Sequence, residues 1–182
     1  MTPQLTTHAM ENALKNLVRW TAFLGGLISP LSVSGAELPD AIAAKGETLV
    51  LTTQAVGAQI YECKADAAGT LSWQFREPIA SLIVSGKTVG RHYAGPFWEM
   101  ADGSAVKAKA VANVPGASAD DIPLLKLEVV ASHGKGELSG VTTIQRLNTK
   151  GGKASGACAT PGAFLSVPYT ADYAFFSKGK GS

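Results

Sequence analysis

Short runs in which apolar and polar residues alternate fill the chain from residue 47 onward. In residues 71–76, for example, Leu71, Trp73 and Phe75 alternate with three polar residues. An alternation of period two predicts strands with one face toward a core and the other toward water, which favours antiparallel pairing. Runs of strand length are residues 48–53, 58–63, 71–76, 80–84, 87–93, 97–100, 105–111, 124–131, 141–147 and 169–176.

Glycine-containing pairs separate these runs, among them Ser85-Gly86 and Asp102-Gly103, and Asp-Gly is a frequent dipeptide in hairpin turns. Only residues 38–44 and 117–122 suit one or two turns of helix. The sequence therefore predicts an all-β fold, a single-domain antiparallel β-sandwich or β-barrel of roughly 8–10 strands with little helix. Strand number does not separate the two architectures, because it fixes neither the shear nor the closure of a sheet.

The first 36 residues have the layout of a secretory signal peptide. Lys15 and Arg19 precede an uncharged run over residues 20–36, which ends in the small residues Ser34, Gly35 and Ala36. A spanning helix needs about 20 predominantly apolar residues, whereas glycine, proline and serine interrupt this run. We therefore expect cleavage before Glu37, a mature domain over residues 37–182, and no stable membrane insertion after cleavage.

The start of this leader is open, because translation from Met10 would give it a more usual length. In either case the leader predicts an exported protein, periplasmic or extracellular. An oxidising compartment permits disulfides, and Cys63 and Cys158 are the two cysteines of the chain. We expect them to form a disulfide, since neither lies in a Cys-x-x-Cys redox motif or a zinc-ligand array.

Composition and charge limit the classes of partner that the protein is expected to bind. The chain is 46% hydrophobic and 16% charged, with a formal net charge of +2 and scattered basic residues. This balance suits a compact domain and gives no basic face that would attract nucleic acid. No Gly-x-Gly-x-x-Gly motif follows a strand, so we expect no nicotinamide cofactor, and no other cofactor is predicted.

The densest group of candidate site residues lies in residues 90–104, which combine a histidine, aromatic rings and two acids. Aromatic rings join an apolar body to a polar edge and recur at binding surfaces. We expect a small ligand, a glycan or an envelope component to bind there. The candidate binding residues are His92, Tyr93, Trp98, Glu99, Asp102 and, from a separate strand, Arg146.

The orientation of Arg146 is open. It is a basic residue inside an expected strand, and an inward arginine needs a carboxylate partner such as Asp172 or Glu99. An outward arginine needs none, and the phase of this strand is not fixed by the sequence.

Four segments of the chain resemble the DUF3455 family, whose members occur in bacteria and fungi and have no characterised function. The segments are residues 57–63, 90–104, 143–152 and 167–173. Some fungal relatives carry a malate dehydrogenase label, but the sequence shows neither the dinucleotide motif nor the βαβ alternation that this activity needs. The resemblance thus implies a family and no reaction.

Two other functions compete with a non-catalytic binding module. A hydrolase or metal-assisted enzyme would use His92 with Glu99 or Asp102, but no His-x-His or His-Glu-x-x-His spacing ties these residues to each other or to His133. We therefore predict no metal site and assign no catalytic residue. A structural or adhesion protein would instead expose a continuous apolar patch.

Overall fold

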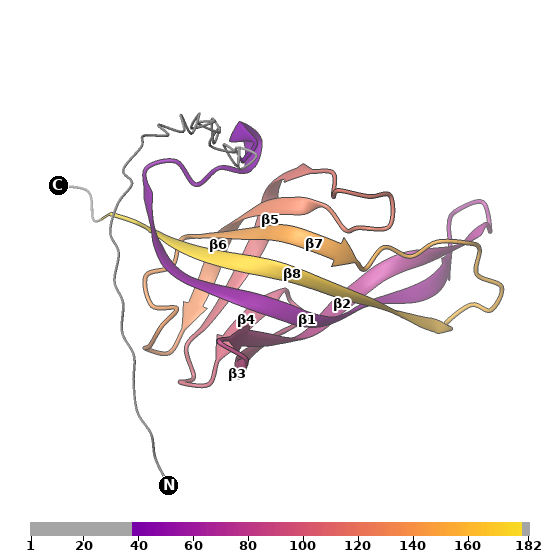
Figure 1. Cartoon of the computed structure of the whole chain (residues 1–182). Coiled ribbons are helices and arrows are strands. Elements are labelled where there is room, and N and C mark those ends of the chain that lie inside the picture. The colour runs from indigo at the N-terminus through magenta and orange to yellow at the C-terminus, as the bar shows by residue number, and fades with distance from the viewer. Residues whose placement is uncertain (1–37, 180–182) are drawn as a thin grey trace, which may run out of the picture. The chain divides into compact units, whose positions relative to one another are not determined.

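Residues 38–179, which the computed structural model describes, form a closed barrel of eight antiparallel strands that follow one another in chain order (Figure 1). The last strand pairs with the first and closes the sheet. The all-β prediction is confirmed, and the barrel is the one of the two expected architectures that forms. Its elements are η1 (Asp40–Ile42), β1 (Glu47–Ala65), β2 (Leu71–Val84), β3 (Lys87–Tyr93), β4 (Phe97–Met100), β5 (Ala105–Val114), β6 (Leu124–His133), β7 (Thr143–Gly151) and β8 (Phe164–Lys178).

The expected signal peptide, its cleavage before Glu37 and the alternative start at Met10 lie outside the described residues. No helix within residues 38–179 is long and apolar enough to cross a membrane. Of the two helical segments expected, the first contains the three-residue 3-10 turn η1, while residues 117–122 form turns and a bridge.

Two pairs of expected strands are each one continuous strand. Residues 48–53 and 58–63 both belong to β1, and residues 71–76 and 80–84 both belong to β2. Gly57 is no turn residue here, because it lies opposite Ala80, where any Cβ would collide with the Ile79 carbonyl oxygen. At Pro78, β2 pairs with β1 opposite Gln59 but not with β3, which pairs with β2 only from Ala80 onward, so the proline occupies an edge position of the kind in which sheets tolerate it.

Alternate side chains point into the barrel, and they fill it differently at its two ends. At the end near the β2–β3 turn, large apolar side chains pack together, among them Leu82, Met100, Val106, Ile144 and Phe175. At the other end, the inward positions carry polar and aromatic side chains such as Gln59, His92 and Tyr173. A small barrel of eight strands has room for a packed interior or for one small ligand.

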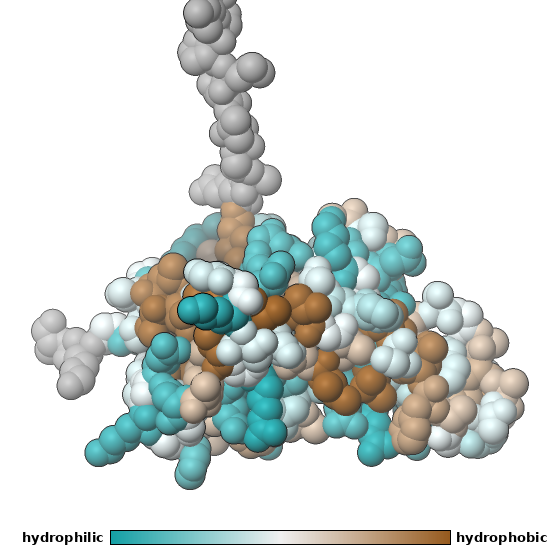
Figure 2. All heavy atoms as spheres, turned by 60° about the horizontal axis from the view of Figure 1, so that its bottom comes forward, coloured by the Kyte–Doolittle hydropathy of each residue, from teal (hydrophilic) through white to brown (hydrophobic). Residues whose placement is uncertain are grey.

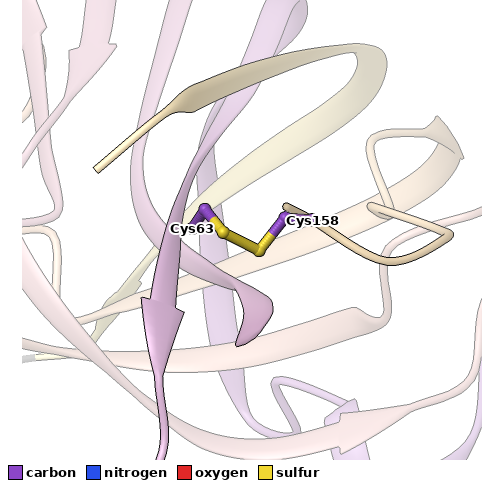
Figure 3. Close-up of a disulfide and its surroundings, with 2 residues drawn as sticks. All are labelled: Cys63 and Cys158. Atoms are coloured by element: carbon purple, nitrogen blue, oxygen red, sulfur yellow. A yellow bond between two sulfur atoms is a disulfide. The ribbon is translucent and has the colours of Figure 1, made fainter. Parts of the chain in front are cut away.

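Strands β1, β2 and β8 continue together past the ends of β6 and β7 as a ribbon (Figure 1). A disulfide between Cys63 of β1 and Cys158 of the β7–β8 loop joins that loop to the ribbon, with the two Cα atoms 5.8 Å apart (Figure 3). The pairing expected from the sequence therefore holds. Cys63 lies on the inward face of β1, four residues beyond Gln59, so the bond braces the strand that continues into the barrel.

Contacts with the start of the described chain show which side chains of β7 face out of the barrel. The Gln145 side chain donates a hydrogen bond of 2.5 Å to the Ile42 carbonyl of η1, on the outside of the barrel. Thr143, two residues earlier, donates to Glu47 at 3.0 Å. Because neighbours on a strand face opposite ways, Ile144 and Arg146 point into the barrel, which answers the question that the sequence left open.

Candidate ligand-binding site

A cavity of about 190 Å³ lies inside the barrel at the end from which the ribbon projects, and every strand contributes to its wall. Its lining is mainly apolar or aromatic, with few polar groups, which is the usual makeup of a small-molecule site. The lining residues are Gln59, Phe75, Pro78, His92, Pro96, Trp98, Ala110, Leu125, Leu127, Arg146 and Tyr173.

An aromatic cluster of His92, Trp98 and Tyr173 forms one side of the cavity. His92 and Trp98 are directly opposite each other on β3 and β4, and their rings stack with centroids 4.1 Å apart. Tyr173 of β8 packs edge-on against both, at 5.1 Å from His92 and 5.3 Å from Trp98. All three side chains are buried, so the cluster is a rigid wall.

His92 is a neutral imidazole in this setting. Its Nδ1 lies 2.8 Å from the Phe97 carbonyl oxygen, and because a carbonyl only accepts, Nδ1 carries the proton and Nε2 is left as an acceptor. Burial, the largest cause, and the nearby Arg146 cation together lower the pKa of His92 to about 3, against the opposing effect of this hydrogen bond. A base this weak is a poor proton acceptor at neutral pH.

Five buried polar atoms have no hydrogen-bond partner of good geometry among the described residues, although Tyr169 lies near Gln59 and Tyr173. They are Thr53 Oγ1, Gln59 Nε2, Trp98 Nε1 and the hydroxyl oxygens of Tyr169 and Tyr173. All five belong to inward-facing residues, and three of these residues line the cavity. Buried polar groups in proteins are nearly always paired, so this concentration indicates that water or a ligand inside the barrel completes them.

Arg146 supplies the positive charge of the cavity. Its Nε donates to the Pro123 carbonyl oxygen at 3.0 Å, which holds the guanidinium in place. Neither carboxylate expected as its partner reaches it: Asp172 accepts from Asn148 at 2.7 Å, and Glu99 lies on the outer face. Among residues 38–179 no ion pair involves Arg146.

Tyr93 and Glu99 lie on the outside of the barrel, although they are the sequence neighbours of His92 and Trp98. The Tyr93 hydroxyl donates to Glu99 Oε2 at 2.7 Å, and Arg91 Nη2 donates to both Glu99 oxygens at 3.0 and 3.1 Å. The hydrogen bonds from Tyr93 and then Arg91 lower the pKa of Glu99. These contacts form a surface network that does not meet the cavity.

Asp102 has a structural position in the β4–β5 turn. Its carboxylate accepts the backbone N–H and the hydroxyl of Ser104, at 2.8 and 2.6 Å, and the N–H of Glu137 at 2.8 Å. The Ser104 hydroxyl bond and the Glu137 amide bond hold the pKa of Asp102 below its usual value. Asp102 therefore ties the turn to the β6–β7 connection.

Of the six candidate binding residues, the structure brings three together at one cavity: His92, Trp98 and Arg146. It does not bring His92 to Glu99 or Asp102, as the enzymatic alternative requires. The aromatic rings of residues 90–104 are also divided, since Trp98 is inside the barrel while Tyr93 and Phe97 stack on the outer face with ring centroids 5.6 Å apart. Within residues 38–179 no three potential metal ligands cluster.

Sequence reasoning missed Gln59, Tyr169 and Tyr173. The signal was present, because residues 57–63 and 167–173 are two of the four segments that resemble the family. Alternation along the second segment places Tyr169, Ala171 and Tyr173 on a single face, and the structure shows that face to be the inward one.

A wider hollow of about 640 Å³ lies along β6, where its pairing with β7 ends at Glu128 and Thr143. Of its lining residues only Val141 is buried, and none of the unpartnered polar atoms belongs to it. It is an open surface depression, and the barrel cavity is the better candidate site.

The fold and the cavity define the class of protein: a small antiparallel β-barrel that encloses a mixed aromatic and polar cavity at one end. The chain belongs to the DUF3455 family, because the family model, described as "Protein of unknown function (DUF3455)", matches residues 43–177. That match spans all eight strands. No curated protein and no solved structure matches the chain.

Proposed function

We propose that this protein is an exported, non-catalytic binding module that holds a small molecule inside its barrel. The observation that carries the proposal is the coincidence of the cavity with the unpartnered buried polar atoms Gln59 Nε2, Trp98 Nε1 and the Tyr173 hydroxyl. Leaving such a group unpaired costs about 1–3 kcal/mol of stability. A fold that carries several around one cavity gains from a ligand that pairs them.

The size of the cavity supports a compact ligand. A cavity of about 150 Å³ in another protein holds benzene, so about 190 Å³ accommodates one ring with a small substituent. Phe75, Leu125 and Leu127 provide an apolar wall against which such a ring would pack.

Two features favour binding over catalysis. The pKa of His92, at about 3, makes it a weak base at neutral pH. In addition, none of the cavity-lining residues is a serine, threonine, cysteine or carboxylate, and burial raises the pKa of Tyr173, which makes its hydroxyl a poor nucleophile for a covalent mechanism. The hydrolase alternative would need His92 to meet Glu99 or Asp102, and those side chains are elsewhere.

An adhesion role has less support. The exposed large apolar residues, such as Val50, Val111 and Phe164, are distributed over several strands. Figure 2 shows hydrophobic residues in separate patches between hydrophilic ones on the face in view. Adhesion through one continuous apolar surface would need a larger patch.

Export rests on the leader and on the disulfide, which an oxidising compartment permits. Expression of the full gene in a bacterial host with an intact secretion system tests it. We expect intact mass to give a chain that begins at Glu37 and carries no free thiol. An uncut leader on cytosolic material would contradict export.

Binding is tested with single-ring probes, namely benzoate, benzamide and toluene, by calorimetry and by tryptophan fluorescence, to which Trp98 of the cavity wall contributes. Ala110 is exposed at the cavity rim, so Ala110→Trp should fold and block entry, lowering affinity at least about tenfold. Ala131→Trp, on an exposed position away from the cavity, is the matched control and should bind normally. If no probe binds the folded wild-type protein, or if both variants bind equally well, the proposal is wrong.

A further inference from the structure

The polar atoms that face the cavity are mostly hydrogen-bond donors. Trp98 Nε1 and the guanidinium of Arg146 only donate, and the unpartnered atom of Gln59 is its amide nitrogen. The Tyr173 hydroxyl, which lies near Arg146, can both donate and accept, and His92 Nε2 is an acceptor. A complementary ligand must therefore present several acceptor oxygens close together.

The charge of the cavity wall also favours a ligand with acceptor oxygens. Its lining contains one arginine, a neutral histidine and no acid, so the described wall carries a single positive charge. The influence of Arg146 extends to the aromatic cluster, because the cation lowers the pKa of His92 and opposes the raising of the Tyr173 pKa by burial. A cation in a largely apolar setting is stabilised most by an anion that it can hydrogen-bond.

The geometry of the arginine favours a planar anion. Its Nε is already committed to the Pro123 carbonyl oxygen, while its terminal Nη groups have no acidic partner among the described residues. Guanidinium and carboxylate groups are both planar and match each other with paired hydrogen bonds. A carboxylate at Arg146 would leave the rest of the ligand against the apolar wall.

We propose that the cavity binds a small monocarboxylic acid with an apolar body of about one ring, whose carboxylate pairs with Arg146 and accepts from the neighbouring donors. This inference rests on the proposed binding function and names the chemical class of its ligand. The single positive charge matches a monoanion, and the apolar remainder of the wall matches an unsubstituted ring or a branched aliphatic chain of equal size.

The test compares benzoate with benzamide, a neutral molecule of nearly the same shape, on the wild-type protein by calorimetry at pH 7. We expect benzoate to bind at least about tenfold more tightly, because hydrogen bonds to a charged group are stronger than those between neutral groups. The preference should shrink as salt is raised. Equal affinities would overturn the inference and leave the proposed function intact, whereas failure of both probes and of toluene would overturn the proposed function itself.

A pair of variants assigns the effect to the cavity. Arg146→Gln should lose the preference for benzoate, so that benzoate and benzamide bind with affinities within about twofold of each other. Arg91→Gln removes an equal charge from the outer face, where Arg91 pairs with Glu99, and should keep the preference. If Arg146→Gln does not fold, the comparison of the two probes on the wild-type protein still decides. A benzoate preference retained in folded Arg146→Gln would overturn the assignment.

Discussion

Removing the hydroxyl of Tyr173 should stabilise the protein without ligand, which is the opposite of what a buried tyrosine usually gives. The Tyr173 oxygen is buried and lies near Tyr169 and Arg146, but it forms no hydrogen bond of good geometry with any described residue, so folding replaces its water only in part. Such a group costs about 1–3 kcal/mol. Water within the cavity reduces this cost, and we expect Tyr173→Phe to raise the free energy of unfolding by about 1 kcal/mol, a rise in Tm of roughly 2–4 °C for a domain of this size.

Tyr61→Phe is the matched control, since the Tyr61 hydroxyl donates to the Gly152 carbonyl oxygen at 2.8 Å. Loss of that bond should lower the free energy of unfolding by about 0.5–1.5 kcal/mol. Urea unfolding followed by circular dichroism measures both variants, and an unchanged m-value shows that the same surface is exposed. If Tyr173→Phe destabilises the protein as much as Tyr61→Phe does, the hydroxyl is hydrogen-bonded within the barrel and the reasoning behind the binding site is refuted.

Three further predictions concern the frame that holds the site. His92 has a folded pKa of about 3 against 6.5 when unfolded, so between these values the unfolded chain binds more protons and the free energy of unfolding falls as the pH is lowered. Between pH 7 and pH 5 the loss should be about 2 kcal/mol. Urea titrations at each pH measure this loss, and His92→Gln should abolish it. Replacing Cys63 and Cys158 by serine opens a loop of 95 residues and should cost about 4–5 kcal/mol in the chain-entropy account, measured by the same titration and absent if the thiols never pair. Gly57→Ala should separate β1 from β2 at Ile79, costing several kcal/mol, and a near-neutral result would show that the two strands are not in close contact at this position.

The fold class was predictable because it depends on local pattern, while the closure of the barrel was not. The alternation of Leu71, Trp73 and Phe75 indicates a strand wherever that strand lies. The pairing of β1 with β8, such as Gln54 with Asp172, joins residues more than a hundred positions apart. Nothing in either segment alone specifies that partner, and a sandwich would satisfy the same alternation.

Three of the six binding residues predicted from the sequence line the cavity, and two of them, His92 and Trp98, were predictable for a physical reason. Residues 90–104 form a hairpin in which His92 faces Trp98 across two neighbouring strands, a relation that spacing around a turn implies. The same alternation places Tyr93 and Glu99 on the opposite face, so the density of polar and aromatic groups in this segment is divided between the cavity and an outer surface network. Gln59 and Tyr173 come from strands that are neighbours only in the closed barrel, and their roles follow from closure.

The disulfide and the cavity belong to one mechanical unit, which would connect the proposed exported location to the proposed binding function. Gln59 and Cys63 lie on the same face of β1, and the ribbon that carries Cys63 also carries Phe75 of the cavity wall. Beyond Ala80 toward the ribbon, β2 has no partner in β3, so this wall is paired on one side only. The disulfide fixes the β7–β8 loop to β1, the strand with which this part of β2 is paired. A site whose unpaired donors already cost stability depends on such restraint, because a wall that relaxed would let water reach Gln59 and Trp98 and weaken the advantage of the ligand. The bond that oxidation forms is thus expected to sharpen binding as well as to raise stability.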